Sequence, residues 1–175
     1  ETVSKLIIDI PELTAREDHR GIVMATVVCV RIGEEAFGTN AGFGQLMLTI
    51  RAEFESELDA LDAEICARAR AYARQDGITN VEVQYRDSFP ETRNTPDAVA
   101  AVRKARLECE LPEARWDEPF RSSEDFGCYT KLTSGALFYI GCGTRHAKLH
   151  TREYDFNDEI IEPAVDMMFR LAQDA

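Results

Sequence analysis

Two segments with the apolar pattern of β-strands, joined by a glycine-rich connection, constrain the fold of this chain most strongly. Residues 21–31 are almost continuously apolar and rich in valine, whereas residues 45–53 alternate between apolar and polar side chains. A period of two directs one set of side chains to a buried face and the other set to solvent. The connection, residues 32–44, holds four glycines, which favours a turn or loop. We therefore predict two strands, the second with one buried face.

Helical patterns flank these strands. Apolar residues in 3–13 are spaced by three and four, which predicts the end of an amphipathic helix. A longer helix is predicted over 54–75, where Glu64 and Arg68 stand four residues apart and form a favourable pair. Gly77 lies where a C-terminal cap is expected.

Residues 81–85 alternate again, which predicts a third strand. The order helix, strand, strand, helix, strand is typical of an α+β sandwich with helices on one face of an antiparallel sheet. The hydrophobic fraction of 45% is sufficient for a sizeable core. We therefore expect residues 1–88 to form one domain with this architecture.

The pattern changes near residue 89, and we assign 89–175 to a second segment. Thr95 followed by Pro96 predicts a helix start, and the helix extends to about residue 107. A short helix is predicted over 124–131, with Ser122 or Ser123 as its cap.

The rest of this segment offers little sheet. A short buried strand is predicted at 136–140, and Asn157 opens a final helix to about residue 172, in which Pro163 marks either a kink or the true start. One short strand cannot cover three helices. Either the segment forms a lobe with a one-strand sheet, or its partner strands lie in sequence that this chain does not contain. We favour the second interpretation and expect an incomplete α/β segment.

Charge and composition exclude several classes of partner. The net charge of -12 argues against nucleic acid and anionic membrane surfaces, which are bound through clustered Lys and Arg. No apolar run approaches the length of a membrane span, and no signal peptide opens the chain. The five cysteines form no CxxC pair, which favours reduced thiols and a cytoplasmic location. Since the chain begins at Glu1 without a Met, we expect its N-terminal part to have been removed.

Three motifs carry a resemblance that covers essentially the whole chain. Residues 149–158 read Leu-His-Thr-Arg-Glu-Tyr-Asp-Phe-Asn-Asp; residues 123–126 read Ser-Glu-Asp-Phe and precede a strand ending in Gly-Cys-Gly; residues 89–94 read Phe-Pro-Glu-Thr-Arg-Asn. In this order and spacing the chain resembles the C-terminal half of hippurate hydrolases, indole-acetyl-amino-acid hydrolases and aminoacylases, a family of zinc-type amidohydrolases. The resemblance implies a ferredoxin-like lid or dimerisation domain, followed by the last part of a metal-dependent catalytic domain.

The family pattern gives His150 a role as the last protein ligand of a centre with two divalent metal ions, zinc, manganese or cobalt. Residue chemistry alone favours an ordinary polar loop residue at His150, and it is the resemblance that favours the metal ligand. His146, four residues earlier, is regarded as incidental because the surrounding glycines favour a loop over a helical His pair. The family's other metal ligands and its general-base Glu come from an N-terminal segment that has no counterpart here.

The resemblance implies further roles. Arg51 would reach a substrate carboxylate across the dimer, for which a bidentate guanidinium is suited, and the backbone N–H groups of Gly141 and Gly143 would approach the substrate. The adjacent acids Glu124 and Asp125 would support the metal-bearing loop, although compensation of a helix dipole explains them equally well. The family's Asn would fall at position 38, which is Gly here.

The function that the resemblance implies is hydrolysis of N-acyl amino acids or small peptides by a metal-dependent enzyme that forms a homodimer through its lid. We expect this chain alone to be inactive, because it lacks most metal ligands. The alternative is a free-standing α+β module that dimerises or binds a small ligand without catalysis.

Overall fold

A computed structural model describes residues 1–114, 116 and 118–173. The chain forms two compact units. The first comprises Glu1–Glu91 together with Pro119–Ser123, and the second comprises Thr92–Glu118 and Glu124–Ala175.

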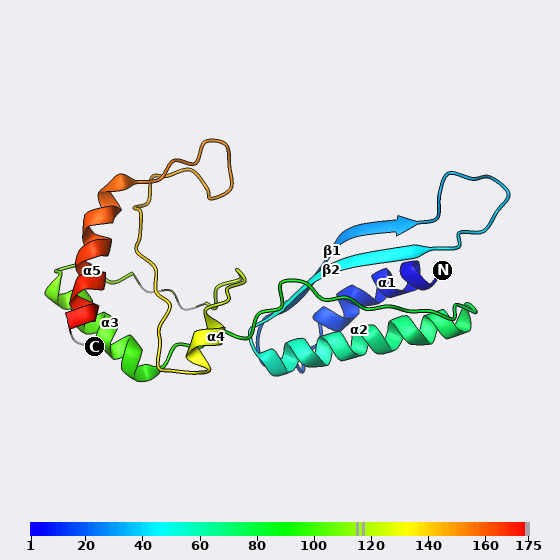
Figure 1. The fold of residues 1–175 in the computed structure, drawn as a ribbon, viewed down its shortest axis with the longest axis horizontal. Helices are drawn as coiled ribbons and strands as arrows, with labels where there is room; N and C mark the ends of the chain where they lie inside the picture. The colour runs from blue at the N-terminus through cyan, green and yellow to red at the C-terminus, as the bar shows by residue number, and fades with distance from the viewer. Residues whose placement is uncertain (115, 117, 174–175) are drawn as a thin grey trace. The chain divides into compact units, whose positions relative to one another are not determined.

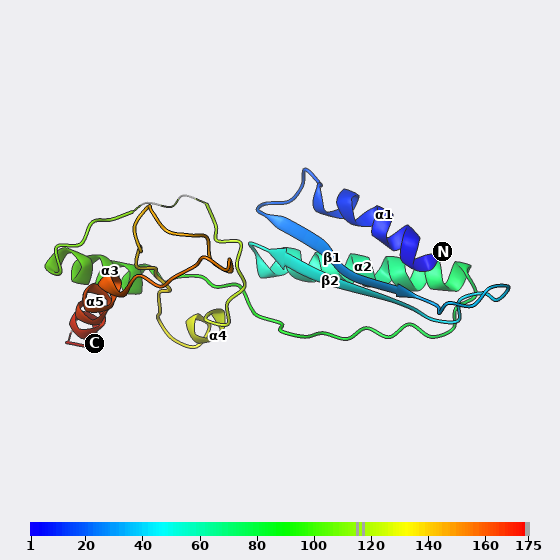
Figure 2. The same ribbon diagram turned by 90° about the horizontal axis from the view of Figure 1, so that it is seen from above.

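The first unit is a two-layer α+β arrangement. Helix α1 (Thr2–Thr14) precedes the antiparallel strands β1 (Val23–Ile32) and β2 (Gly44–Ala52), and helix α2 (Glu55–Gln75) follows. Both helices lie on one side of the strands (Figure 1), and α1 and α2 run side by side along them when seen from above (Figure 2). The two strands and the helices before and after them are confirmed.

The core of the first unit lies between the strands and the two helices. The face of β2 that was expected to be buried packs toward this core, while Met47 on the opposite face is exposed. Burial of these apolar side chains is the main stabilising contribution to the unit. The buried cluster comprises Leu6, Leu13, Val23, Leu61 and Ile65, with Leu46, Leu48 and Ile50 packed against it.

A polar network joins α1 to α2 beside this core. Arg68 contacts Glu64 at 2.9 Å and Asp9 at 3.0 Å, and the Tyr72 hydroxyl donates to Asp9. The hydrogen bond from Tyr72, followed by the contact with Arg68, lowers the pKa of Asp9. The expected pair of Glu64 and Arg68 is therefore confirmed, and Asp9 extends it to the neighbouring helix.

Gly77 ends α2 as predicted. Its φ of 72° lies in the left-handed region, which glycine adopts without a Cβ clash. The N–H of Gly77 donates to the Arg74 carbonyl at 3.2 Å, and that of Ile78 donates to the Ala73 carbonyl at 2.8 Å. These two bonds form a Schellman motif and satisfy carbonyls that the helix leaves free.

The predicted third strand over 81–85 is wrong. Among the described residues the sheet contains β1 and β2, and residues 79–86 have no strand conformation. Tyr85 instead donates its hydroxyl hydrogen to Asp62 of α2 at 2.8 Å, and this bond raises the pKa of Tyr85. This segment pairs with neither outer edge of the two-stranded sheet, so its alternating pattern does not produce a ladder.

The second unit contains α3 (Pro96–Glu108), the short helix α4 (Gly127–Thr130), a 3-10 turn over Asp158–Ile160 and α5 (Ile161–Gln173), with α3 packed against α5. Helix α3 agrees with the prediction. Pro163 lies in the first turn of α5, where its missing N–H needs no partner, so it marks the helix start. Asn157 accepts the N–H of Glu159 at 3.1 Å, as expected for a capping residue.

Two local predictions in this unit are wrong. Helix α4 covers only part of 124–131, and Phe126 occupies the N-cap position in place of Ser122 or Ser123. Residues 136–140 are not a strand. Asn94 instead pairs with the backbone of Leu137, accepting its N–H at 2.8 Å and donating to its carbonyl at 2.9 Å. A side-chain amide thus provides the hydrogen bonds that a strand would provide.

The α+β fold class is confirmed for the described residues. None of their helices is both long and apolar enough to cross a bilayer.

Candidate functional site

His150 occupies a tight turn in the second unit. The N–H and the hydroxyl of Thr151 both donate to the Lys148 carbonyl, at 3.2 Å and 2.8 Å. The turn holds His150 at a φ of 65°, a left-handed conformation that is uncommon for a residue with a Cβ. Its side chain is exposed and makes no hydrogen bond or ion pair within the described parts of the chain.

Left-handed backbone conformations of residues with a Cβ are concentrated at functional sites. Because the imidazole of His150 can also bind metal, its conformation motivates a functional hypothesis. The neighbouring His146 differs: its Nδ1 lies 2.8 Å from the carbonyl oxygen of Ala147. His150 therefore presents its imidazole to solvent with both ring nitrogens available, while one nitrogen of His146 faces a backbone acceptor.

The glycines of the Gly-Cys-Gly segment lie in an exposed connection. Gly143 has a φ of 93°, which only glycine adopts readily, and a Cβ placed at Gly141 or Gly143 would meet no atom within 4 Å. The carbonyl of Cys142 between them accepts a hydrogen bond from Asn157 at 3.3 Å. This bond links the glycine segment to the residue that caps the 3-10 turn before α5.

Glu124 and Asp125 lie just before α4, and both are exposed. The Asp125 carbonyl accepts the N–H of Cys128 at 2.9 Å, so the backbone of this acid takes part in the first turn of the short helix. The predicted supporting role of these two acids beside a metal-bearing loop remains a proposal.

Arg51 lies in the first unit, on the exposed face of β2. Its guanidinium donates to the backbone carbonyl of Arg121, which belongs to the same unit. This bond engages one of the five N–H donors of the guanidinium, and the role of Arg51 toward a substrate carboxylate remains a proposal.

The described residues do not assemble a metal centre. Within the part of the chain that the structure describes, no three His, Cys, Asp or Glu side chains form a group that could hold a metal ion. A structural or catalytic zinc site needs three or four protein ligands. The side chains described here therefore do not suffice for the two-metal centre, and His150 can supply one ligand at most.

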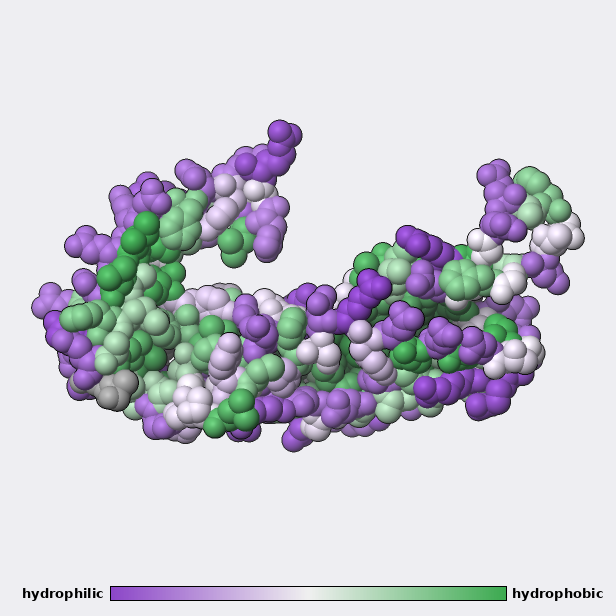
Figure 3. Space-filling view, in the orientation of Figure 1, coloured by the Kyte–Doolittle hydropathy of each residue, from purple (hydrophilic) through white to green (hydrophobic). Residues whose placement is uncertain are grey.

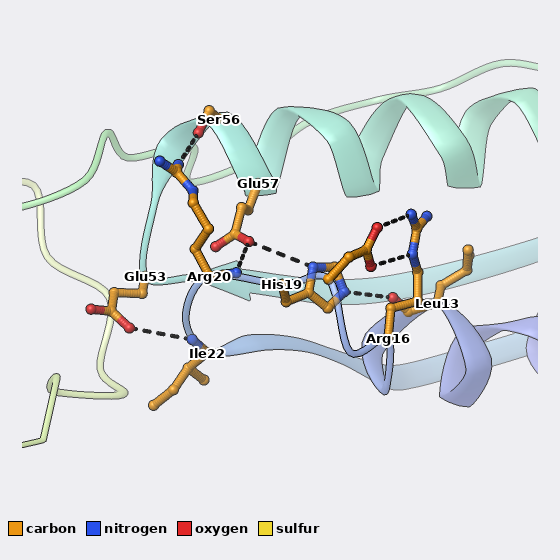
Figure 4. A network of polar contacts seen from close by, with 9 residues as sticks. Leu13, Arg16, His19, Arg20, Ile22, Glu53, Ser56 and Glu57 are labelled. Atoms are coloured by element: carbon orange, nitrogen blue, oxygen red, sulfur yellow. Dashed lines mark hydrogen bonds and ion pairs between the residues drawn. The ribbon is translucent and has the colours of Figure 1, made fainter.

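Sequence reasoning did not identify a second polar cluster, which lies in the first unit where α1 ends and α2 begins (Figure 4). His19 and Glu57 are its central residues, with the Nδ1 of His19 3.7 Å from the Oε1 of Glu57. The two residues lie 38 positions apart, so the sequence does not reveal this pairing. The sequence offers one local signal, because a histidine and four charged residues occupy positions 16–20, shortly after the end of a predicted helix.

Comparison with known proteins gives one informative similarity. The chain is 27% identical over 133 residues to an uncharacterised hydrolase of Staphylococcus haemolyticus (strain JCSC1435), a match that covers 73% of this chain and 34% of that protein. The chain thus spans about a third of the length of this relative. No protein-family profile matches the chain, and no solved structure matches it. The chain is therefore related in sequence to a hydrolase, whose name specifies no substrate or metal.

Proposed function

We propose that this chain is part of a metal-dependent amidohydrolase that cleaves N-acyl amino acids or small peptides. The observation that carries the proposal is the similarity to a hydrolase over 133 residues, which covers most of the chain. The motif around His150 adds the reaction class, because it resembles the metal-ligand segment of the amidohydrolase family.

The geometry of the His150 turn supports its role as a metal ligand. An exposed imidazole with both nitrogens available can bind a divalent ion such as zinc, manganese or cobalt. Since the described side chains do not complete a site, the remaining ligands of the proposed two-metal centre would come from a segment outside this sequence.

The proposal also assigns the two units. The first, with its two strands and two helices, would belong to a ferredoxin-like lid that forms a homodimer, and the second to the end of the catalytic domain. In a βαββαβ sandwich the final strand pairs with the first strand. That first strand has no counterpart among the described residues, which accounts for the unpaired conformation of 79–86.

The proposal is tested in a full-length hydrolase that contains this chain. We expect His150→Ala to lower bound metal and to reduce kcat/KM for N-benzoylglycine by at least roughly a hundredfold, since loss of even an indirect metal contact costs about 10- to 100-fold. His146→Ala is the matched control and should retain metal and activity.

Two quantities are measured for the full-length variants: the bound metal and the rate of amide hydrolysis. The 175-residue chain serves as the inactive reference. We expect no hydrolysis by that chain with added zinc, because one imidazole cannot close a site. Equal metal content in the two His variants, or hydrolysis by the 175-residue chain alone, would contradict the proposal.

A further inference from the structure

Helix α5 has two apolar faces, and within the described part of the second unit one of them is covered. Met167 is 3% exposed and shares a face with the half-buried Ala164 and Leu171, and α5 packs against α3. The other apolar face, here called the α5 stripe, gathers hydrophobic side chains at the surface in Figure 3. Its members, each at least 50% exposed, are Ile161, Val165, Met168 and Phe169.

The charged side chains of α5 occupy a third face. Glu162, Asp166 and Arg170 follow one another at intervals of four residues and are all exposed, so this face is suited to water. The α5 stripe has the spacing i, i+4, i+7 and i+8, which is typical of a helix face that packs on a neighbour. A helix with two adjoining apolar faces and one charged face packs between two neighbours, of which α3 is one.

A second copy of this chain does not suit the α5 stripe. A specific dimer interface buries about 800 Å² on each partner and involves roughly 20–30 residues a side. The stripe offers four side chains on a helix of 13 residues. Two such stripes in contact would therefore leave most of the area that a stable dimer needs unfilled.

The similarity to the staphylococcal hydrolase indicates a larger partner within the same polypeptide. The match covers 34% of that protein, which leaves about two thirds of it outside the match. The second unit also contains a strand pattern without strand conformation, over residues 136–140, where the side chain of Asn94 binds the backbone of Leu137. A pair of helices with an uncovered apolar face, beside a segment with an unused strand pattern, is typical of a layered α/β arrangement from which most of the sheet is missing.

We propose that the α5 stripe packs against the apolar face of a β-sheet formed by the part of the hydrolase that lies outside these 175 residues. This inference rests on the proposed function, because it takes the chain to be part of a longer enzyme. In that enzyme α5 lies between α3 and the sheet, and the face with Glu162 and Asp166 stays in water. Burial of the stripe then removes its apolar surface from solvent, which stabilises the contact.

Hydrogen exchange, followed by mass spectrometry, compares α5 in a full-length hydrolase that contains this chain with α5 in the 175-residue chain. We expect the amides of 161–173 to exchange at least roughly a hundredfold more slowly in the full-length protein, because a helix between two layers opens only with a large part of the domain. In the 175-residue chain one face of the helix is open to water, so its amides should exchange faster.

Val165→Lys tests the stripe itself, and Asp166→Lys on the charged face is the matched control. In the full-length protein Val165→Lys should lower the protection of α5 at least roughly tenfold, because it places an ammonium group in an apolar interface. Asp166→Lys should leave it unchanged. In the 175-residue chain neither substitution should alter protection, because both positions are exposed. If full-length Val165→Lys does not fold, Val165→Ala replaces it and should lower protection by at least roughly threefold.

Equal protection of α5 in the full-length protein and in the 175-residue chain would overturn the proposal, as would equal effects of the substitutions at 165 and 166 in the full-length protein. Sedimentation of the 175-residue chain tests the rival partner: a dimer that Val165→Lys converts to a monomer would assign the stripe to a second copy and also overturn the proposal. None of these measurements depends on bound metal or on amide hydrolysis. A failure of the proposed catalytic function is therefore distinguishable from a failure of this interface.

Discussion

At the scale of single residues, Asp97 shows how one hydrogen-bond chain joins two distant segments of the second unit. Ser134 donates to the carboxylate of Asp97 at 2.6 Å, and the hydroxyl oxygens of Thr95 and Ser134 lie 2.7 Å apart. The N–H of Gly135 donates to the Thr95 hydroxyl at 3.1 Å. Thr95 thus uses its side chain to bind residues 134–135, in addition to its position at the start of α3.

These contacts lower the pKa of Asp97 from its ordinary value of 3.8 to about 2, chiefly through the hydrogen bond from Ser134. A depressed folded-state pKa means that Asp97 stabilises the unit above about pH 4, and that this contribution is lost as pH falls toward 2. We expect Ser134→Ala to move the pKa of Asp97 upward, toward 3.8. A carboxyl-detected NMR titration measures both midpoints, and equal midpoints in the two proteins would rule out Ser134 as the cause.

At the scale of elements, the packing of α2 against the strands and α1 depends on a few apolar side chains. Leu61 is 4% exposed and lies in the cluster that joins α1, α2 and β1. We expect Leu61→Ala to lower the free energy of unfolding of the first unit by about 2–4 kcal/mol, since it removes buried methyl groups and leaves a cavity. Ile8→Ala on α1 is the control: Ile8 is 75% exposed, and its loss should cost under about 0.5 kcal/mol.

Urea unfolding, followed through amide signals of residues 1–91, separates these two substitutions. A loss below about 1 kcal/mol for Leu61→Ala would mean that the helix relaxes into the space or that the interface is loosely packed.

The elements that could be predicted from sequence are those whose pattern is satisfied locally. Helix α2 has a 3.6-residue apolar pattern and a glycine cap, and β1 and β2 lie close together in sequence across one connection, so each was predicted within a few residues. The segments 81–85 and 136–140 have strand patterns as well, but a strand forms only where another strand offers hydrogen bonds. Their side chains and backbone bind Asp62 of α2 and Asn94 instead.

The same distinction holds for the candidate sites. The sequence motif identified His150 as a candidate ligand because motif and residue are contiguous, and its metal-binding role stays a prediction. The cluster of His19 and Glu57 could not be predicted, because it depends on the packing of two helices that meet far apart in sequence.

At the scale of the whole molecule, the two units differ sharply in how much apolar surface they bury. The buried hydrophobic side chains of the first unit come from both helices and a strand, whereas in the described part of the second unit they are Ala105 and Met167. The second unit instead exposes an apolar stripe along α5, visible as a gathering of hydrophobic side chains in Figure 3. The stripe comprises Ile161, Val165, Met168 and Phe169, each at least 50% exposed.

Because local stability follows buried apolar contact, we expect the second unit to open far more readily than the first. Hydrogen exchange of the 175-residue chain, measured by mass spectrometry at neutral pH, should show amides in α3 and α5 less protected than those in α1 and α2 by roughly tenfold or more. Replacing Val165 and Phe169 by Lys or Glu should not lower this protection further, because both native side chains are already exposed. Equal protection in the two units would show that the α5 stripe is covered in solution, in which case the same two substitutions should expose it and accelerate exchange in α5.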